Sequence, residues 1–466
     1  MLNIRKTKIF ATMGPASANE KVLQHFIQNG VNAVRLNFSH GSHDEYTRTI
    51  KLIRRIKPDM PVMADLKGAE IRTVVQNANG IKLEAGRKVE LVFDNSKITA
   101  DNFSLNYKDI AAISRRGNHI LIDDGNIDLK IESVGKDRLI LIPQQNYTLL
   151  DKKGTHFTGI DVPFPLITER DKQDIAYAEA QKVDYLAASM IKSEKELRAI
   201  KSLISGNIKL VAKIEHPLAL KNIEAIMDSA DMILVARGDL GVEMPVTEVP
   251  TIQKTLIARA RAKAKPVIIA TQLLDSMMHN SRPTRAEVND IANGIYDKVD
   301  ALMLTGETAA GQYPQEAVSY LNETIVKTEA KLDYYTAPAL ESKNKKNSAD
   351  AISLAAVDTA YALKVKALLC FTTSGSTALR IARFRPSMPI ITFTPVAETA
   401  RQLAAVFGIC ALKTPYFKNT DEMISHAQKV LLEKKIAAGG DSFVMTAGIP
   451  LAQSGPTNMI RVLEFN

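Results

Sequence analysis

One pattern recurs from the N-terminus to about residue 330: a short apolar run ends in polar or charged residues, and an amphipathic stretch follows it. Apolar runs that alternate with helices are typical of βαβ units and of a parallel sheet. Eight such units close into a barrel. The runs are 7–14, 33–41, 61–68, 184–190, 209–215, 232–239, 266–272 and 301–308. The sequence therefore predicts the α/β class and a (β/α)8 TIM barrel.

The stretches between the runs have the features of helices. Apolar residues from Val22 to Ile27 recur at helical spacing, and Gly30 ends the pattern. Thr284 with Glu287 three positions later forms a capping box, a typical helix start. Most of the eight runs carry polar residues at their carboxyl ends, where barrel enzymes keep their chemistry.

Two further domains are predicted outside the barrel. Over a hundred residues separate the third run from the fourth. They contain stretches in which apolar and polar residues alternate, and Gly, Asp and Asn residues separate these stretches. This pattern indicates a β-rich inserted domain. After "ESKNKKNS", helices and strands alternate again, which predicts a doubly wound α/β domain. The expected division is a barrel of 1–70 and 167–335, a lid of 71–166 and a C-terminal domain of 345–466, about what 466 residues allow.

Composition and charge argue against several classes. The net charge of +9 comes from dispersed lysines and arginines, there is no tryptophan, and no basic stripe with interleaved aromatic residues points to nucleic acid. The electrostatic field of a positively charged protein attracts small anionic substrates. No apolar run reaches the roughly 20 residues of a membrane span, and no signal peptide is recognisable. Cys370 and Cys410 lie in apolar runs and are expected to be reduced, so we expect a cytoplasmic protein with no membrane partner.

The fifth run, "KLVAKIE", sets Lys213 and Glu215 two positions apart, so both side chains lie on one face of the strand. Asp239 ends the sixth run. Neighbouring parallel strands lie about 4.8 Å apart, so the two carboxylates are expected to share a hard divalent cation such as Mg²⁺. Lys213 would then supply a separate positive charge suited to a phosphoryl group.

Other runs add polar residues at the same barrel face. Arg35, Asn37 and Ser39 alternate at the end of the second run, which places them on one side. Further candidates at the ends of the third, seventh and eighth runs are Asp65, Lys67, Glu70, Arg72, Thr271, Thr305 and Glu307.

These residues belong to longer motifs. "VRLNFSHG", "AKIE", "VARGDLGVE", "IATQLLDSM", "RPTRAE" and "LTGETAAGQYP", with "IDDG" and "KKG" in the insertion and "TAG" near the end, closely resemble the pyruvate kinase family over nearly the whole chain. The resemblance is to the bacterial type without an extra C-terminal domain. It implies a catalytic barrel, a lid and an effector domain, and phosphoryl transfer from phosphoenolpyruvate to ADP through an enolate held on a divalent metal.

The resemblance also implies roles for individual residues. Arg35 is similar to the arginine that binds the substrate phosphate, and Lys213 to the lysine that stabilises the phosphoryl transition state. Glu215 and Asp239 are similar to the ligands of Mg²⁺ or Mn²⁺. Gly238 and Asp239 would bind the substrate carboxylate, and Thr271, with Glu307 behind it, would take part in protonation of the enolate. The resemblance implies a K⁺ site formed by Asn37, Ser39, Asp65 and the Leu66 carbonyl. It implies a nucleotide site formed by Asn37, His40, Arg72 and Lys153.

Three positions depart from the family pattern. "DLKGAEIR" has Leu66 for threonine and Ala69 for proline, and Leu66 is typical of K⁺-independent members whereas Glu70 is typical of K⁺-dependent ones. We expect K⁺ dependence, because the carboxylate of Glu70 calls for a counter-cation. "TGET" replaces "SGET" and keeps the hydroxyl, and Met190 replaces an aromatic residue that we expect to serve packing.

The C-terminal domain contains "TTSGST", residues 372–377, at a predicted strand-to-helix turn. Such a turn can hold a phosphate, and the resemblance implies an effector site for a sugar phosphate or AMP, formed by Thr372, Thr373, Ser374, Gly375, Ser376 and Thr377. An ordinary capped helix is the alternative. The resemblance further implies a homotetramer.

Two other functions stay open at this point. A Mg²⁺-dependent pyruvate-enolate aldolase, or another barrel enzyme that uses phosphoenolpyruvate, would also place Glu and Asp at strand ends, but it would need neither the lid nor the "NFSHG…DLKG" cluster. A basic protein that binds nucleic acid is the alternative of a different class.

Overall fold

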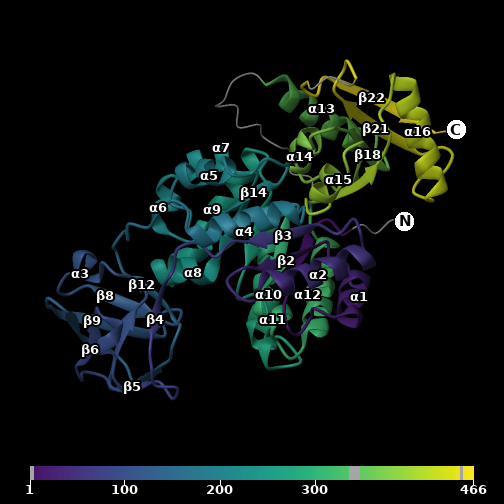
Figure 1. Ribbon diagram of the computed structural model, residues 1–466. Coiled ribbons are helices and arrows are strands. Elements are labelled where there is room, and N and C mark those ends of the chain that lie inside the picture. Colours follow the sequence, from purple (N-terminus) through teal and green to yellow (C-terminus); the bar gives the residue numbers. More distant parts are fainter. Residues whose placement is uncertain (1–4, 335–346, 452–454, 466) are drawn as a thin grey trace.

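A computed structural model describes residues 5–334, 347–451 and 455–465. The expected junction between the barrel and the C-terminal domain, at 335–345, lies outside these residues. Figure 1 shows three bodies in a row, with the barrel in the middle and the other two at opposite ends. Within the described residues, no helix has the length and apolar character that a membrane span requires.

The central body is a closed barrel of eight parallel strands, as the repeating pattern predicts. Going round it, the order is β1-β17-β16-β15-β14-β13-β3-β2. The strands are β1 (Lys8–Met13), β2 (Ala33–Asn37), β3 (Val62–Asp65), β13 (Tyr185–Ala188), β14 (Lys209–Ile214), β15 (Met232–Ala236), β16 (Val267–Ala270) and β17 (Ala301–Leu304).

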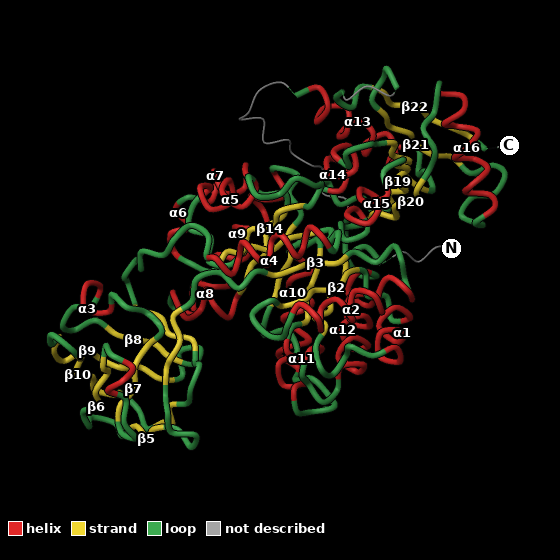
Figure 2. Tube along the Cα trace, in the orientation of Figure 1, coloured by secondary structure: helices red, strands yellow, loops and turns green. Residues whose placement is uncertain are grey.

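Helices surround the barrel (Figure 2). Their buried faces pack on the outward side chains of the strands, while side chains such as Phe10, Met63 and Leu234 fill the interior. The capping box of Thr284 and Glu287 starts α10, as predicted. The helices are α1 (Glu20–Gln28), α2 (His43–Ile56), α4 (Glu169–Ala180), α5 (Glu194–Lys201), α6 (Pro217–Lys221), α7 (Ile223–Ser229), α8 (Arg237–Glu243), α9 (Val249–Ala262), α10 (Arg285–Tyr296), α11 (Gly306–Ala309) and α12 (Pro314–Glu329), with short 3₁₀ turns at Val246–Glu248 and Asp275–Met278.

The inserted segment forms a second closed barrel, mostly antiparallel, that we call the lid. Its order is β10-β6-β7-β4-β12-β8-β9, with β11 and β5 paired separately. It has its own apolar core, which includes Phe103 and Phe157. Its elements are β4 (Ile71–Val74), β5 (Ile81–Leu83), β6 (Val89–Val92), β7 (Asn102–Leu105), α3 (Ile110–Ile113), β8 (His119–Ile122), β9 (Ile127–Val134), β10 (Arg138–Pro143), β11 (Tyr147–Leu149) and β12 (Gly154–Phe157), with a 3₁₀ turn at Asn95–Lys97.

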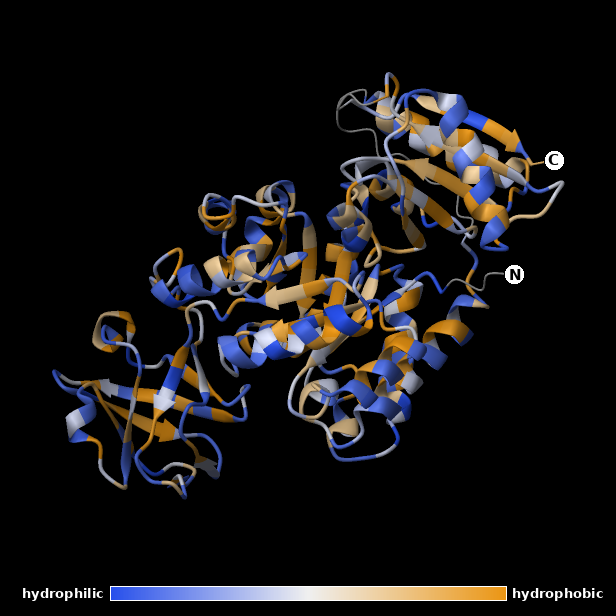
Figure 3. Ribbon diagram, turned by 45° about the vertical axis from the view of Figure 1, so that its right-hand side comes forward, coloured by the Kyte–Doolittle hydropathy of each residue, from blue (hydrophilic) through white to orange (hydrophobic). Residues whose placement is uncertain are grey.

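The C-terminal body is a five-stranded sheet in the order β20-β19-β18-β21-β22, parallel except for β22. Figure 3 shows its strands and those of the barrel as predominantly hydrophobic. Its elements are α13 (Ser348–Ala362), β18 (Ala367–Phe371), α14 (Ser376–Ala382), β19 (Ile390–Thr394), α15 (Ala397–Leu403), β20 (Ile409–Lys413), α16 (Thr420–Glu433), β21 (Ser442–Ala447) and β22 (Met459–Glu464).

The barrel presents opposite ends to its two neighbours. The lid departs after the carboxyl end of β3, and the C-terminal domain contacts residues that precede strands, such as Asp184 and Asp300. In barrels of this type, the carboxyl ends of the strands carry the chemistry. The site is therefore expected between the barrel and the lid.

Candidate active site

A cavity of about 940 Å³ lies between the barrel strand ends and the lid. Its walls carry charges of both signs from both bodies. Of the residues that the sequence proposed, the cavity is lined by Arg35, Asn37, Ser39, His40, Lys67, Glu70, Arg72, Lys153, Lys213, Glu215 and Asp239. Asp65 lies directly behind this wall, whereas the segment 372–377 belongs to the C-terminal domain at the other end of the barrel.

Lys213 is the centre of a buried charge cluster. Its Nζ lies 2.7 Å from Glu215 Oε1 and 3.4 Å from Asp65 Oδ1. Arg35 donates from Nε to Asp65 Oδ2 at 2.6 Å. Side chains two apart on β14 share a face, so the observed pair of Lys213 and Glu215 follows directly from the strand geometry.

The charges in this cluster shift one another's pKa. Burial alone would lower the pKa of Lys213, but Asp65 and Glu215 outweigh it and hold that pKa above its usual value. Burial would raise the pKa of Asp65, yet Lys213 and Arg35 keep it below normal. Burial raises the pKa of Glu215, and the nearby charge of Asp239 adds to the rise. Lys213 is therefore a permanent cation, and burial together with the charge of Asp239 disfavours the ionised Glu215 carboxylate despite its contact with Lys213.

Glu215 and Asp239 are the carboxylates that the strand ends bring to one cavity. The described residues contain no group of three or more His, Cys, Asp or Glu side chains arranged for a metal. Two protein carboxylates fit a hard divalent ion that takes its other ligands from water and substrate, as Mg²⁺ usually does. The donor set, and the repulsion from Asp239 that contributes to the raised pKa of Glu215, therefore suit such an ion.

Two residues that the sequence did not single out as functional support this cluster from the end of β13. Ser189 Oγ accepts from Lys213 Nζ at 2.8 Å and donates to the Leu66 carbonyl at 2.8 Å. The Met190 N–H donates to Glu215 Oε2 at 2.6 Å. Met190 has φ = 55°, a conformation uncommon for a residue with a side chain. Its role thus includes a backbone contact beyond the packing expected for its side chain.

A second strained residue lies at the end of β16. Thr271 has φ = 68°, an outlier for a β-branched residue. Arg237 donates to the Thr271 carbonyl at 2.7 Å and pairs with Asp290, which holds the turn. The Gly238 N–H donates to Thr271 Oγ1 at 2.8 Å, and a Cβ at Gly238 would stand 3.3 Å from that oxygen. Gly238 and Thr271 therefore form one unit beside Asp239.

Glu307 is buried behind these strand ends and does not line the cavity. Its Oε1 accepts from the Leu274 N–H at 3.0 Å, and its Oε2 accepts from the Thr305 N–H at 2.7 Å. The carboxylate thus ties the segment after β16 to the segment after β17.

The residues expected at K⁺ are spread over neighbouring strand ends. Asn37 Oδ1 accepts from the Ser39 N–H at 3.2 Å, and the Leu66 carbonyl accepts from Ser189. Glu70 is paired with Arg72, whose Nε lies 2.8 Å from Glu70 Oε2. The protein therefore supplies a counter-charge of its own to Glu70, which weakens the argument for K⁺ that rested on this carboxylate.

The lid side of the cavity contains Lys153, which the sequence proposed, and further residues that sequence reasoning missed. Lys153 Nζ donates to Asp123 Oδ1 at 2.8 Å, within the lid. His156 on β12 reaches across the cavity, and its Nδ1 lies 2.7 Å from Glu243 Oε1 on α8. Burial lowers the pKa of His156, but Glu243, with Asp239 and Asp124 beyond it, outweighs burial and raises that pKa.

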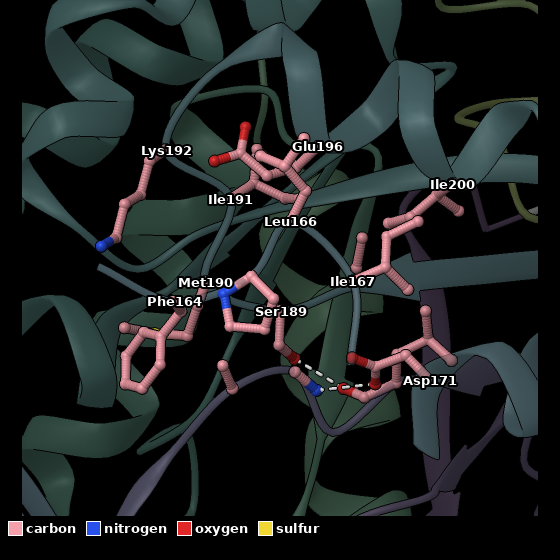
Figure 4. Close-up of a pocket in the computed structure, with 15 residues that line it drawn as sticks. Phe164, Leu166, Ile167, Asp171, Ser189, Met190, Ile191, Lys192, Glu196 and Ile200 are labelled. Atoms are coloured by element: carbon pink, nitrogen blue, oxygen red, sulfur yellow. Dashed lines mark hydrogen bonds between the residues drawn. The ribbon is translucent and has the colours of Figure 1, made fainter. Parts of the chain in front are cut away.

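A smaller pocket of about 60 Å³ lies behind Ser189 and Met190. Figure 4 shows Phe164 and Met190 on one side of it and Ile167, Ile200 and Asp171 on the other. Asp171 Oδ1 accepts from the Gly68 N–H at 3.1 Å and so ties the barrel to the chain segment that leads to the lid.

The proposed effector segment forms the turn between β18 and α14. Thr372 Oγ1 accepts from the Gly375 N–H at 3.0 Å, and Gly375 has φ = 88°. Thr377 is buried, and its hydroxyl lies 2.6 Å from that of Thr457. Ser374 and Ser376 are hydrogen-bonded to each other at 3.2 Å near the surface.

A barrel with a buried lysine and paired carboxylates at its strand ends, facing a lid, defines an enzyme that acts on small anionic substrates. Comparison with known proteins gives the particular family. The family model for the pyruvate kinase barrel domain matches residues 4–318, and that for the pyruvate kinase alpha/beta domain matches residues 350–463.

Individual relatives agree. The chain is 40% identical to a pyruvate kinase of Staphylococcus saprophyticus and 39% identical to one of Staphylococcus aureus, with 98% of the chain and 80% of each relative covered. A crystal structure of a pyruvate kinase from Cryptosporidium parvum superposes with a TM-score of 0.92 at 30% identity, covering 99% of this chain and 96% of that one.

The chain therefore belongs to the pyruvate kinase family, as its motifs indicated. Its reaction is the transfer of a phosphoryl group from phosphoenolpyruvate to ADP, which gives pyruvate and ATP. The aldolase alternative finds no support in these comparisons, and neither does nucleic-acid binding.

Proposed function

We propose that phosphoryl transfer takes place in the cavity between the barrel and the lid, with Lys213 facing the migrating group. The observation that carries this is the buried cluster of Lys213, Arg35 and Asp65 at one wall of a cavity that both bodies line. Phosphoryl transfer depends on positioning and on charge neutralisation more than on covalent help. Arg35 binds the phosphate of phosphoenolpyruvate, and Lys213 stabilises the charge spread over the group in transit.

Lys213 acts as a fixed charge and not as an acid. Its pKa is held high by Asp65 and Glu215, so it stays protonated throughout the physiological range. Asp65 orients both cations, because it accepts from Arg35 and lies within 3.4 Å of Lys213. Ser189 fixes the position of the lysine from the other side.

The divalent cation that the family generally requires binds at Glu215 and Asp239, and Mg²⁺ or Mn²⁺ is our proposal for it. When bound, this ion supplies Lewis-acid charge stabilisation. The Met190 N–H keeps the Glu215 carboxylate in place for it. Gly238 and Asp239 hold the substrate carboxylate at the start of α8.

Thr271 guides the proton that the enolate collects. Its hydroxyl oxygen accepts from the Gly238 N–H, so the hydroxyl proton is free to point elsewhere. The strained backbone at Thr271 supports a functional role, because strain of this kind gathers at active sites. Glu307 contributes by holding the segments after β16 and β17 and is a positioning residue in this scheme.

The nucleotide side is proposed at Asn37, His40, Arg72 and Lys153, the last of these on the lid. All four line the same cavity. Closure of the lid would bring Lys153 to the phosphates and exclude water, which otherwise competes as acceptor.

K⁺ is proposed at Asn37, Ser39, Asp65 and the Leu66 carbonyl. Oxygen donors from neighbouring strand ends support it, whereas the pairing of Glu70 with Arg72 argues for a weaker requirement. Full rate in buffer free of both K⁺ and Na⁺ would contradict this proposal.

The regulatory proposals are a sugar phosphate or AMP bound at Thr372–Thr377 and assembly as a homotetramer. The surface position of Ser374 and Ser376 supports the first. A Ser374→Ala, Ser376→Ala double variant that keeps its full response to every phosphorylated effector would contradict it. The cytoplasm is our proposal for the location, on the sequence argument alone.

The central test is steady-state kinetics with phosphoenolpyruvate and ADP, with pyruvate detected by a coupled reaction. K⁺, Mg²⁺, Mn²⁺, sugar phosphates and AMP are varied in turn. We expect pyruvate formation that depends on ADP and on a divalent cation. Pyruvate release without ADP would contradict phosphoryl transfer in this cavity.

A further inference from the structure

Cations gather at the boundary between the barrel and the C-terminal domain, far from the active site. Arg261 and Lys265 come from the barrel, at the end of α9 and after it, and Arg383 and Arg385 follow α14 of the C-terminal domain. The four line one small cavity of about 10 Å³. Asp300 is the sole carboxylate among the described residues that line it.

Asp300 cannot neutralise this group, because its oxygens are already engaged. Its Oδ2 accepts from Arg385 Nη2 at 2.5 Å and from the Val267 N–H at 3.0 Å. Its Oδ1 accepts from the Phe407 N–H at 3.2 Å. Arg385 is thereby paired, and Arg261, Lys265 and Arg383 make no hydrogen bond to this carboxylate.

Arg261 and Arg383 are incompletely paired. The Nε of each is buried and has no hydrogen-bond partner among the described residues. The contact from Arg261 Nη2 to the Arg383 carbonyl is long, at 3.5 Å. Arg383 Nη2 lies 3.2 Å from Asp350 Oδ1, but Arg380 shares that carboxylate, and the Arg383 side chain is only 8% exposed.

Unpaired buried donors are costly, and those attached to cations more so. The pKa of Arg261 reflects this: burial and then the charge of Arg385 lower it to about 10. Other arginines along the same boundary are paired with carboxylates. Arg401, for example, donates from Nε to Asp184 Oδ1 at 2.6 Å.

We propose that this cavity binds a small inorganic anion of the size of chloride, held between Arg261 and Arg383. Hydrogen bonds from two guanidinium groups to an anion are charge-assisted and strong. The small space, about 10 Å³, favours a ligand of very few atoms, and the pocket opens toward solvent. The anion links the barrel to the C-terminal domain, because each contributes one of the two arginines.

The first experiment compares thermal unfolding of the full chain in KCl and in potassium gluconate at equal concentration, so that K⁺ is constant. Gluconate is much larger than chloride, so it is the reference anion. The test variant is Arg261→Gln, and the control is Arg259→Gln, which removes a half-exposed arginine from the same helix. For each protein, the measured quantity is the rise in melting temperature from gluconate to chloride. We expect this rise to be about 2 °C larger for the wild type and for R259Q than for R261Q. An equal salt response in all three proteins would overturn the proposal.

The second experiment locates the anion directly. Crystals of the wild type grown or soaked in KBr should show an anomalous bromide peak between Arg261 and Arg383, and crystals of R261Q should lack it. A wild-type map without that peak, or a peak that persists in R261Q, would overturn the proposal. Sulfate and phosphate serve as a size test, and we expect neither to restore the stabilisation that chloride gives.

Discussion

The two ends of the barrel meet their neighbours in opposite ways. At the carboxyl ends of the strands, a cavity of about 940 Å³ separates the barrel from the lid, and His156 with Glu243 bridges it. At the amino ends, the C-terminal domain is bonded tightly to the barrel, with Arg385 on Asp300 and the Gln402 side chain on the Asn207 carbonyl. One end leaves room for substrates, and the other does not.

This difference assigns separate tasks to the two boundaries. An open boundary with few direct bonds lets the lid move over a substrate, as closing lids do in many enzymes. A closed boundary transmits a change in the C-terminal domain to the barrel, because packed interfaces are not continuously deformable. We therefore expect changes at the open end to alter kinetics and changes at the closed end to alter stability.

The largest effect is expected from Lys213→Met at the open end. The variant removes the cation that faces the phosphoryl group, and we expect kcat/KM to fall about a thousandfold, in line with the loss of a preorganised electrostatic group. The control is Lys195→Met, an exposed lysine on α5. Steady-state kinetics measures both, with thermal melts to confirm folding. A Lys213→Met enzyme that keeps a tenth of the wild-type kcat/KM would contradict the role of this lysine.

At the closed end, Asp300→Ala should act on stability. The change leaves Arg385 buried without its partner, and breaking a buried pair from one side costs about 3 kcal/mol or more. Chemical denaturation measures the free energy of unfolding, and Asp358→Ala on the exposed face of α13 is the matched control. An Asp300→Ala protein as stable as this control would show that the boundary is not held by charge pairing.

Ser189 tests how finely the open end is arranged. Ser189→Ala removes the hydroxyl that holds Lys213 Nζ, and we expect kcat/KM to fall about tenfold with little change in melting temperature. Ser189→Thr keeps a hydroxyl and should recover most of the loss. If Thr rescues no better than Ala, the hydroxyl does not position the lysine.

The sequence predicted those parts of the fold and of the site that follow from the periodic spacing of residues. The eight strands follow from apolar runs at regular spacing, and the contact between Lys213 and Glu215 follows from their two-residue separation on β14. The same rule would also have paired Glu70 with Arg72, whose contact bears on the K⁺ argument.

Other parts of the site leave no trace in the sequence. The Met190 N–H binds Glu215 through the backbone, so the residue type does not reveal it. Ser189 is one of many serines, and its role depends on which strands become neighbours. The bridge between His156 and Glu243 joins positions 87 apart in the chain, and only the docking of the lid brings them together.

The smallest effect is expected from His156→Gln, which tests that bridge by pH. The pKa of His156 is raised in the docked lid, because Glu243, Asp239 and Asp124 outweigh burial. The protonated bridge is fully formed below the usual pKa of about 6.5 and is lost as pH rises through the raised value. Between pH 6.5 and 8.5, we therefore expect the KM for ADP of the wild type to rise a few-fold more than that of His156→Gln. The control is His119→Gln, because His119 pairs with Asp128 inside the lid and does not reach the barrel. If His119→Gln flattened the pH response as much as His156→Gln, the response would belong to the lid itself and not to its contact with the barrel.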